Sequence, residues 1–418
     1  MQRLSSALGV ARYLSGARAD SRSPPESAVL HQAVWGLEQR TPELSAATGL
    51  WTWQKCALAA LPAAIGCGAL AAPETTLAVL LAIMAIPFLF VVALRSAALW
   101  HLVAPPAPPS APPPVRTDAE LLPLYTVLVP LYHEACVVPH LLAALTALDY
   151  PADRLEIILV VESVDADTQA ALRAAALARH MRVLVVPDGS PRTKPRAIQY
   201  ALQFAHGHYV VVYDAEDVPE PDQLRRAIAV MLAEPGRLGC LQAQLNIYNS
   251  RTSWLTRQFT IEYTALFDCI LPTLEGLELP VPLGGTSNHF RRAVLDAVGG
   301  WDPHNVTEDA DLGIRLARAG WRVGMLASTT WEEAPPTFRI WLGQRTRWLK
   351  GWMQTYLVHM REPRRLWREL GARRFLGLQV LMGGLILSSL VHPWFYALLA
   401  LDLWQGRLLG MPHTFAGD

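Results

Sequence analysis

Two long apolar runs near the start of the chain place the strongest constraint on its fold. Residues 50–71 hold one charged side chain, Lys55, and residues 75–94 hold none. At about 1.5 Å of helical rise per residue, each run can cross roughly 30 Å of hydrocarbon. Because only the short APET sequence joins them, we expect a transmembrane hairpin. The alternative is that both runs are core helices of a soluble protein.

A third apolar run extends from Leu376 to Trp404 and is interrupted by His392 and Pro393. It predicts one further membrane segment. The apolar runs therefore divide the chain into an N-terminal cytoplasmic tail (1–49), a two-helix transmembrane hairpin (50–103), a proline-rich linker (104–114), an α/β region (115–374), a C-terminal transmembrane segment (375–404) and a tail (405–418).

The distribution of arginine predicts how the spans are oriented. Six arginines lie between residues 361 and 375, and five lie within the first 40 residues, whereas the APET link has no Lys or Arg. Since short positively charged segments remain on the cytoplasmic side, the N-terminus and the 115–374 region are predicted to be cytoplasmic.

Overall charge and cysteine content exclude several other classes of protein. Lys plus Arg and Asp plus Glu are balanced at 36 each, so the net charge does not favour nucleic acid as a partner. The five cysteines are scattered without a CxxC pair. This predicts neither a disulfide framework nor a zinc site, and it fits a reducing compartment.

The region from 115 to 374 has the alternating pattern of an α/β fold. Short apolar runs predict buried strands, and the segments between them have helical spacing. This alternation favours a parallel sheet that is covered on both faces. In such sheets ligands bind at the carboxyl ends of the strands. The predicted strands are 125–130, 155–161, 183–186 and 209–214, and the first two predicted helices are 137–148 and 167–181.

Acidic side chains lie at three of these strand ends. Asp214, Glu216 and Asp217 are at the end of the fourth strand, Glu162 follows the second, and Glu134 follows the first. An Asp-Ala-Glu step can hold a divalent cation through oxygen ligands, with substrate phosphates and water completing the shell. The alternative is a solvated turn that caps the strand, and these residues alone favour neither.

Two later segments also have simple structural explanations. Residues 306–322 predict a helix in which Thr307 caps the start, Glu308 and Asp309 suit the positive first turn, and Gly320 ends it. Capping would account for these acids without any site. Residues 338–356 are amphipathic, basic and rich in tryptophan, which is typical of a helix lying on a membrane surface.

Together and in this order, the segments resemble the membrane-bound family 2 glycosyltransferases. The resemblance is to the cellulose synthase and hyaluronan synthase group and to the bacterial inner-membrane relatives linked to exopolysaccharide and phage adsorption. It covers roughly residues 120–360. Four motifs carry it: DAEDVP (214–219) is similar to the DxD motif, LGGTSNHFRR (283–292) to the acceptor-side segment, TEDADLGIRLARAGWR (307–322) to the TED motif, and QRTRW (344–348) to QxxRW.

The resemblance implies a fold, an activity and a role for each motif residue. The fold would be α/β, a GT-A (Rossmann-like) cytoplasmic domain flanked by transmembrane helices. The activity would be inverting sugar transfer from a nucleotide-diphosphate donor, with Asp309 as the catalytic base and Mg²⁺ or Mn²⁺ held by Asp214 and Glu216. The implied donor contacts are Glu134, Glu162, Lys194, Asp214 and Arg347, and the implied acceptor contacts are Glu308, Gln344 and Trp348.

Three functions follow from these observations. The leading one is transfer of a sugar, most simply UDP-linked, to a growing surface polysaccharide by a multi-pass enzyme of the bacterial inner membrane, with membrane lipid and polysaccharide-export proteins as partners. The second is transfer of a single sugar to a polyprenyl-phosphate or other lipid. The third is a non-catalytic membrane scaffold or receptor component, against which the intact Asp309, Arg347 and Trp348 argue.

Overall fold

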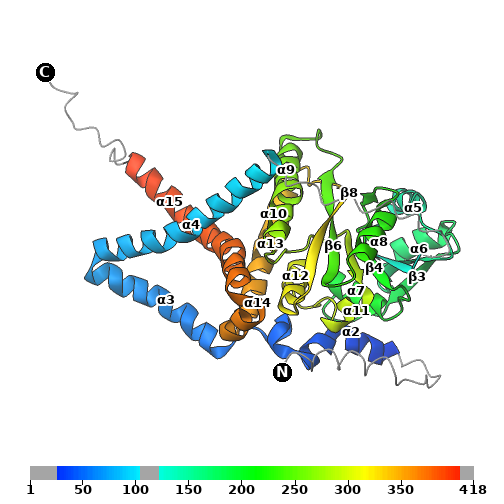
Figure 1. Ribbon diagram of the computed structural model, residues 1–418, viewed down its shortest axis with the longest axis horizontal. Coiled ribbons are helices and arrows are strands. Elements are labelled where there is room, and N and C mark those ends of the chain that lie inside the picture. Colours follow the sequence, from blue (N-terminus) through cyan, green and yellow to red (C-terminus); the bar gives the residue numbers. More distant parts are fainter. Residues whose placement is uncertain (1–25, 104–121, 405–418) are drawn as a thin grey trace.

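The computed structural model describes residues 26–103 and 122–404. The predicted linker at 104–114, the tail at 405–418 and the first 25 residues of the N-terminal tail lie outside the described residues. Long helices extend to one side of an α/β unit that contains the sheet, and a further helix, α2, lies along the lower edge of that unit (Figure 1).

A mixed eight-stranded sheet forms the centre of the α/β unit, in the order β3-β2-β1-β4-β7-β6-β8-β5. Its strands are β1 (Tyr125–Leu131), β2 (Leu155–Glu162), β3 (Met181–Val186), β4 (Tyr209–Val212), β5 (Val218–Pro219), β6 (Leu238–Ile247), β7 (Asn288–Arg291) and β8 (Arg322–Glu332).

Only half of the sheet follows the predicted parallel pattern. Strands β1 to β4 are parallel neighbours, as the alternation predicts. Strand β7 runs antiparallel to both β4 and β6. The segment just before β7 crosses the end of β4, and β7 then runs back along that strand. The Ser287 N–H marks this crossing by donating to the carbonyl of Val212 at 2.8 Å. Beyond β7, β6 and β8 are parallel again.

Helices cover both faces of the sheet, so its strands are apolar on both sides. Val127 and Leu128 are consecutive in β1, and both are fully buried, but they belong to two different core clusters. This is the alternation expected of a strand between two helical layers. The helices of this unit are α5 (Val138–Thr146), α6 (Ala166–Ala174), α7 (Lys194–Leu202), α8 (Gln223–Ala233), α9 (Trp254–Thr264), the π-helix η4 (Ala265–Ile270), α10 (Leu271–Gly276), α11 (Arg292–Ala297), α12 (Glu308–Arg318) and α13 (Phe338–His359).

Among the described residues, three helical segments are long and apolar enough to cross a membrane. Two of them are α3 (Thr52–Ala71) and α4 (Pro73–Val103), joined through Ala72. The third combines α14 (Pro363–Leu378), the π-helix η5 (Gln379–Gly383) and α15 (Gly384–Trp404). Large side chains such as Phe88 are exposed, and Leu70 is 89% exposed. These helices are therefore not part of a protein core, which argues for association with lipid.

The residues just before the first span are folded against the α/β unit, although they were assigned to a tail. Helix α2 (Glu26–Arg40) packs on α7 and buries Val29 and Leu37. The backbone carbonyl of Val29 accepts from Gln203 at 3.0 Å. Two 3₁₀ turns follow, η1 (Pro42–Leu44) and η2 (Ala46–Thr48). Residues 26–40 have weak apolar periodicity because only a narrow face of α2 is buried.

Arg361 fixes this segment to the root of the third span. It lies between α13 and α14, is only 3% exposed, and donates to backbone carbonyls of four residues at 2.6 to 3.1 Å. A second link joins the segment to the α/β unit, because the Ala46 N–H donates to Asp302 at 2.6 Å. The four carbonyls bound by Arg361 are those of Pro42, Glu43, Ser45 and Gly49.

We expect Arg361→Gln to lower the free energy of unfolding by about 3 kcal/mol, because several buried carbonyls lose their donor. Thermal unfolding in detergent micelles measures the loss. Limited proteolysis should also show faster cleavage between residues 41 and 51.

Arg368→Gln is the matched control, since Arg368 belongs to the same basic segment but is exposed. Equal melting temperatures and equal cleavage for the two variants would show that Arg361 does not hold the segment.

Candidate active site

An ion pair lies at the carboxyl edge of the sheet, where the acidic residues were predicted to gather. Asp214 follows β4, and its carboxylate accepts a hydrogen bond from Lys194 at the start of α7. The same ammonium group donates to the carbonyl of Gly285 at 2.7 Å. The positive charge that compensates the acids in this structure is therefore Lys194, which the sequence analysis had placed near the donor.

Asp217 shapes the turn after β4. One of its carboxylate oxygens accepts from the Asp214 N–H at 2.8 Å and from the Thr286 hydroxyl. The other oxygen is buried without a partner among the described groups. Burial, and then the charge of Asp214, raises the pKa of Asp217 well above its usual range. Asp217 therefore stabilises a turn at this strand end, as one of the two interpretations predicts, while Asp214 and Glu216 stay at the edge and the metal site stays a prediction.

Glu216 shares this edge with an acid that the sequence analysis missed, Glu332. Burial, and then the charge of Asp214, raises the pKa of Glu216 to about 7. Glu332 ends β8, and burial followed by the charges of Asp217 and Asp214 raises its pKa well above the ordinary value. The sequence feature that identified Asp214, an acid at the end of an apolar run, also marks Glu332. The run at 322–332 was not recognised as a strand.

Asp309 lies close to this ion pair. A methyl group placed on Gly285 would lie 3.5 Å from a carboxylate oxygen of Asp309 and 4.0 Å from the Lys194 ammonium nitrogen, so the two side chains flank Gly285. Asp309 is in the first turn of α12, as predicted. The predicted cap is wrong, however. The hydroxyl of Thr307 makes no capping bond and lies 3.3 Å from that of Thr355.

The two neighbouring acids of α12 have different environments. Glu308 is buried, and burial followed by repulsion from Asp309 raises its pKa to about 8. Burial also raises the pKa of Asp309, but its hydrogen bond from the Ala310 N–H and the charge of Lys194 oppose this shift. Burial, with the repulsion added to it, thus raises the pKa of Glu308 above neutral, whereas Asp309 has a hydrogen-bond donor and a nearby cation that favour its ionised form.

The raised pKa of Glu308 predicts a pH-dependent difference in stability between the wild type and Glu308→Gln. The unfolded chain loses this proton near pH 4.5 and the folded chain near pH 8. Wild-type stability should therefore fall relative to the variant as pH rises through this window, and level off above it. Melting temperatures of both proteins at pH 5, 6.5 and 8 measure this. A constant difference across the series would mean that Glu308 is ionised in the folded protein.

The QxxRW residues are on α13, beside Asp309. Arg347 is exposed on this helix, and its charge helps to lower the pKa of Asp309 against burial. Gln344 has a buried side-chain oxygen without a partner among the described groups. Trp348 is half-buried and packs against the core. The structure therefore brings Arg347 near Asp309, while Trp348 is partly occupied by packing.

Arg345 accounts for this packing. Its guanidinium carbon lies 4.7 Å from the ring centre of Trp348 and 4.9 Å from that of Phe259. Two of its nitrogens donate to the carboxylate of Glu262 on α9. Cation–π and ion-pair contacts thus join α13 to α9 and fix the orientation of Trp348. Arg345 was not among the predicted site residues, because the QxxRW pattern allows any residue at its position.

Glu134 and Glu162, the predicted nucleoside contacts, differ in accessibility. Glu134 is half-buried, and burial followed by the charge of Asp214 raises its pKa. Glu162 is buried and is paired with the fully buried Arg196. One oxygen of Glu162 is thus committed to an interior ion pair. Only Glu134 is placed close to the Lys194–Asp214 pair.

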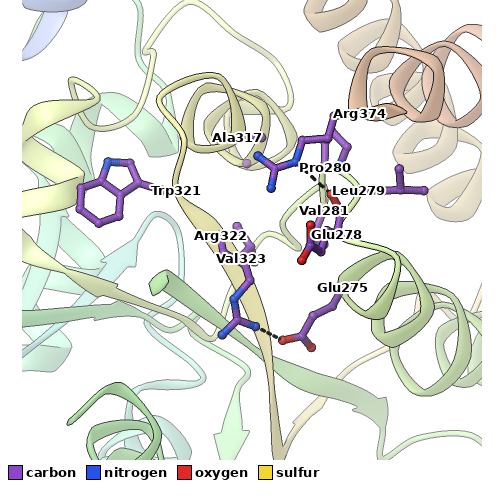
Figure 2. Close-up of a pocket in the computed structure, with 11 residues that line it drawn as sticks. Glu275, Glu278, Leu279, Pro280, Val281, Ala317, Trp321, Arg322, Val323 and Arg374 are labelled. Carbon is purple, nitrogen blue, oxygen red and sulfur yellow. Dashed lines mark hydrogen bonds and ion pairs between the residues drawn. The ribbon is translucent and has the colours of Figure 1, made fainter. Parts of the chain in front are cut away.

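A narrow pocket at the other end of β8 belongs to a different part of the molecule. The pocket has a volume of about 20 Å³ and is lined by the first residues of β8 and by neighbouring helices. Figure 2 shows Arg322 bonded to Glu275 and Arg374 reaching toward Glu278. Because β8 carries Glu332 at its opposite end, this pocket is not part of the acidic edge.

The family of the chain follows from a comparison of its sequence. Residues 123–351, more than half of the chain, match the family described as "Glycosyltransferase like family 2". The chain belongs to this family. The match spans the strand-end acids, the TED segment and QRTRW, so the resemblance drawn from these motifs is confirmed, and the protein is a family 2 glycosyltransferase.

Curated relatives include enzymes with different acceptors. A β-monoglucosyldiacylglycerol synthase of Synechocystis is 31% identical over 311 residues, covering 72% of this chain and 62% of that protein. Glucomannan 4-β-mannosyltransferase 2 of Arabidopsis thaliana is 28% identical over 57% of this chain and 47% of its own length. Cellulose synthase 2 of Novacetimonas hansenii is 28% identical over 58% of this chain and 15% of its own length. The chain thus spans less than two thirds of each of these relatives.

A solved structure confirms the predicted fold. The mannosyltransferase PcManGT from Pyrobaculum calidifontis, determined in complex with GDP-Man and Mn²⁺, superposes with a TM-score of 0.52 at 22% identity. The superposition covers 78% of this chain and 93% of that protein. The α/β unit therefore has the GT-A fold, with long apolar helices before and after it.

Proposed function

We propose that this glycosyltransferase performs an inverting, metal-dependent transfer of a sugar from a nucleotide-diphosphate donor to a hydroxyl group at the membrane surface. One observation carries the proposal: Lys194, paired with Asp214, and the carboxylate of Asp309 flank the same glycine, Gly285. Lys194 would thus be the donor-binding charge and Asp309 the base, on either side of one glycine.

The donor side would use the acidic edge of the sheet. Asp214 and Glu216 offer carboxylate oxygens, and Mg²⁺ or Mn²⁺ bound there would offset the charge of the departing diphosphate. In the part of the chain that the structure describes, no three acidic, His or Cys side chains form a ready metal cluster. Two carboxylates suit a metal whose shell is completed by donor phosphates. Lys194 and Arg347 would bind the diphosphate, and Glu134 and Glu162 would contact the nucleoside, which we expect to be uridine.

On the acceptor side, Asp309 would remove the proton from the attacking hydroxyl. A placed carboxylate base typically contributes about 10²–10⁴-fold. Its raised pKa suits this role, because a stronger base accepts the proton more readily. Protonated Glu308 would avoid a second negative charge beside the base and could donate a hydrogen bond to the acceptor. Gln344 and Trp348 would line the acceptor sugar.

Asp309→Asn should reduce transfer by at least about 10²-fold while leaving donor affinity nearly unchanged, because the amide cannot accept the proton. Turnover assays and nucleotide-sugar binding, both on the full chain in detergent, separate the two effects. Asp214→Ala provides the contrast, since it should lose metal-dependent donor binding. Normal turnover of Asp309→Asn would remove Asp309 as the base.

We propose a growing surface polysaccharide as the acceptor. The names of the glucomannan and cellulose relatives support this choice, since both act on polysaccharides. The enzyme would work in the bacterial inner membrane with its α/β unit in the cytoplasm, alongside polysaccharide-export proteins. Packing of α2 against the α/β unit supports this orientation, because it places the chain before the first span on the same side as that unit.

A lipid acceptor is the second candidate, and a feature of the surface favours it. Helices α9 and α13 are joined by the contact of Arg345 with Glu262, next to Trp348. Both helices expose several large apolar side chains. A lipid hydroxyl could approach Asp309 along such a surface. The relative from Synechocystis, named as a diacylglycerol glycosylating enzyme, points the same way. The exposed side chains are Trp254, Ile261, Phe338, Ile340 and Leu342.

Incorporation of radiolabelled UDP-sugars into membranes containing the enzyme distinguishes these acceptors. Label in a large, solvent-insoluble polymer is the expected result for a polysaccharide acceptor. Label extracted into organic solvent would instead identify a lipid acceptor. No label with any of a panel of nucleotide sugars, with Asp309→Asn as the background control, would favour the non-catalytic scaffold.

A further inference from the structure

The six arginines between residues 361 and 375 do not all serve the same purpose. Four of them are occupied within the protein. Arg361 binds the backbone carbonyls before the first span, and Arg365 pairs with Glu43, Glu362 and Glu369. Arg373 and Arg374 donate to the carbonyls of Leu277 and Glu278, and Figure 2 shows the second of these contacts.

Arg364 and Arg368 are different. Both are exposed, and neither has an ion-pair partner among the described residues. The one hydrogen bond that joins them is a 3.4 Å contact from Arg368 to the carbonyl of Arg364 in their own helix. They are four residues apart, so they project from the same face of α14. Two guanidinium groups are thus left facing outward side by side.

These two arginines line an open pocket on the protein surface, of about 480 Å³. Its other lining residues are Pro363, Trp367 and Phe375. Trp367 is 44% exposed and packs edge-on against Phe375 at 5.0 Å. The pocket therefore combines an aromatic wall with two cations that have no acidic partner.

The pocket is formed by an elbow in α14. At Gly371 the backbone leaves the helical conformation, with φ of +74°, and the helix resumes in a new direction toward α15. Four of the six arginines precede this elbow, two follow it directly, and the apolar span comes next. The start of the first span lies beside the start of this helix, because the Trp53 indole N–H donates to the carbonyl of Arg361 at 3.1 Å. Trp53 and Trp367 are both exposed there, which is typical of side chains at a membrane–water boundary.

We propose that this elbow is a binding site for the headgroup of an anionic phospholipid. The paired guanidinium groups of Arg364 and Arg368 would donate to the phosphate, since Arg matches phosphate oxygens in a bidentate manner. Trp367 and Phe375 would contact the glycerol and the upper acyl chains. The occupant is a lipid rather than a soluble phosphate because the aromatic wall continues into the apolar span, where only acyl chains are available. The proposal rests on membrane association and is independent of the sugar acceptor.

Native mass spectrometry of the full chain in mild detergent tests this site. With equal amounts of phosphatidylglycerol and phosphatidylcholine, the wild type should retain phosphatidylglycerol preferentially. Arg364→Gln/Arg368→Gln should weaken its retention by roughly tenfold or more and leave phosphatidylcholine unchanged. Trp367→Ala should weaken it as well. The matched control is Arg173→Gln/Arg179→Gln, which removes two exposed arginines from the same chain, away from the spans.

Three outcomes would overturn the proposal. One is equal retention of the two lipids by the wild type. Another is equal loss of phosphatidylglycerol in the elbow double variant and in the control, which would indicate a general charge effect. The third is displacement of the lipid by millimolar glycerol 3-phosphate, which would indicate a site for soluble phosphates. Melting temperatures confirm that each variant is folded.

Discussion

The ion pair between Lys194 and Asp214 is the interaction on which the site depends. Asp214, Glu216, Asp217 and Glu332 crowd the carboxyl edge of the sheet, and a single ammonium group faces them. Ionising all four acids in a half-buried crevice would be costly. The raised pKa values of Glu216, Asp217 and Glu332 are one response, and binding a further cation would be another. A nucleotide-sugar donor that arrives with a divalent metal would relieve the same repulsion, which makes donor and metal binding mutually favourable.

The pair formed by Glu308 and Asp309 shows how position decides the chemistry of identical groups. Both are carboxylates in the first turn of α12, where the helix dipole favours negative charge. Glu308 points into the buried side and becomes the protonated partner. Asp309 receives the Ala310 N–H and lies near Lys194 and Arg347, so it can ionise. The proposed base would thus ionise without placing two charges at one point.

Sequence patterns predicted those parts of the fold in which local periodicity decides the structure. Strands β1, β2 and β4 are buried on both faces, so their apolar runs are continuous and easily recognised, and the acids that end them were found. Strand β8 alternates in burial, so its run was missed and Glu332 with it. Thr307 was expected to cap α12, but a tertiary contact with Thr355 takes its hydroxyl. Arg361 could not be interpreted from sequence, because its partners are carbonyls some 310 residues away.

The same long-range contacts would hold the proposed catalytic groups at a fixed height relative to the spans. Helix α2 packs on α7, which begins with Lys194, and Ala46 is bonded to Asp302, shortly before α12 and Asp309. Arg361 then joins this segment to the root of the third span. Lys194, Asp309 and the spans are therefore parts of one connected framework. An acceptor must bring its hydroxyl to that height, which both a polysaccharide held at the membrane surface and a lipid in the bilayer can do, whereas a freely diffusing sugar would gain nothing from the arrangement.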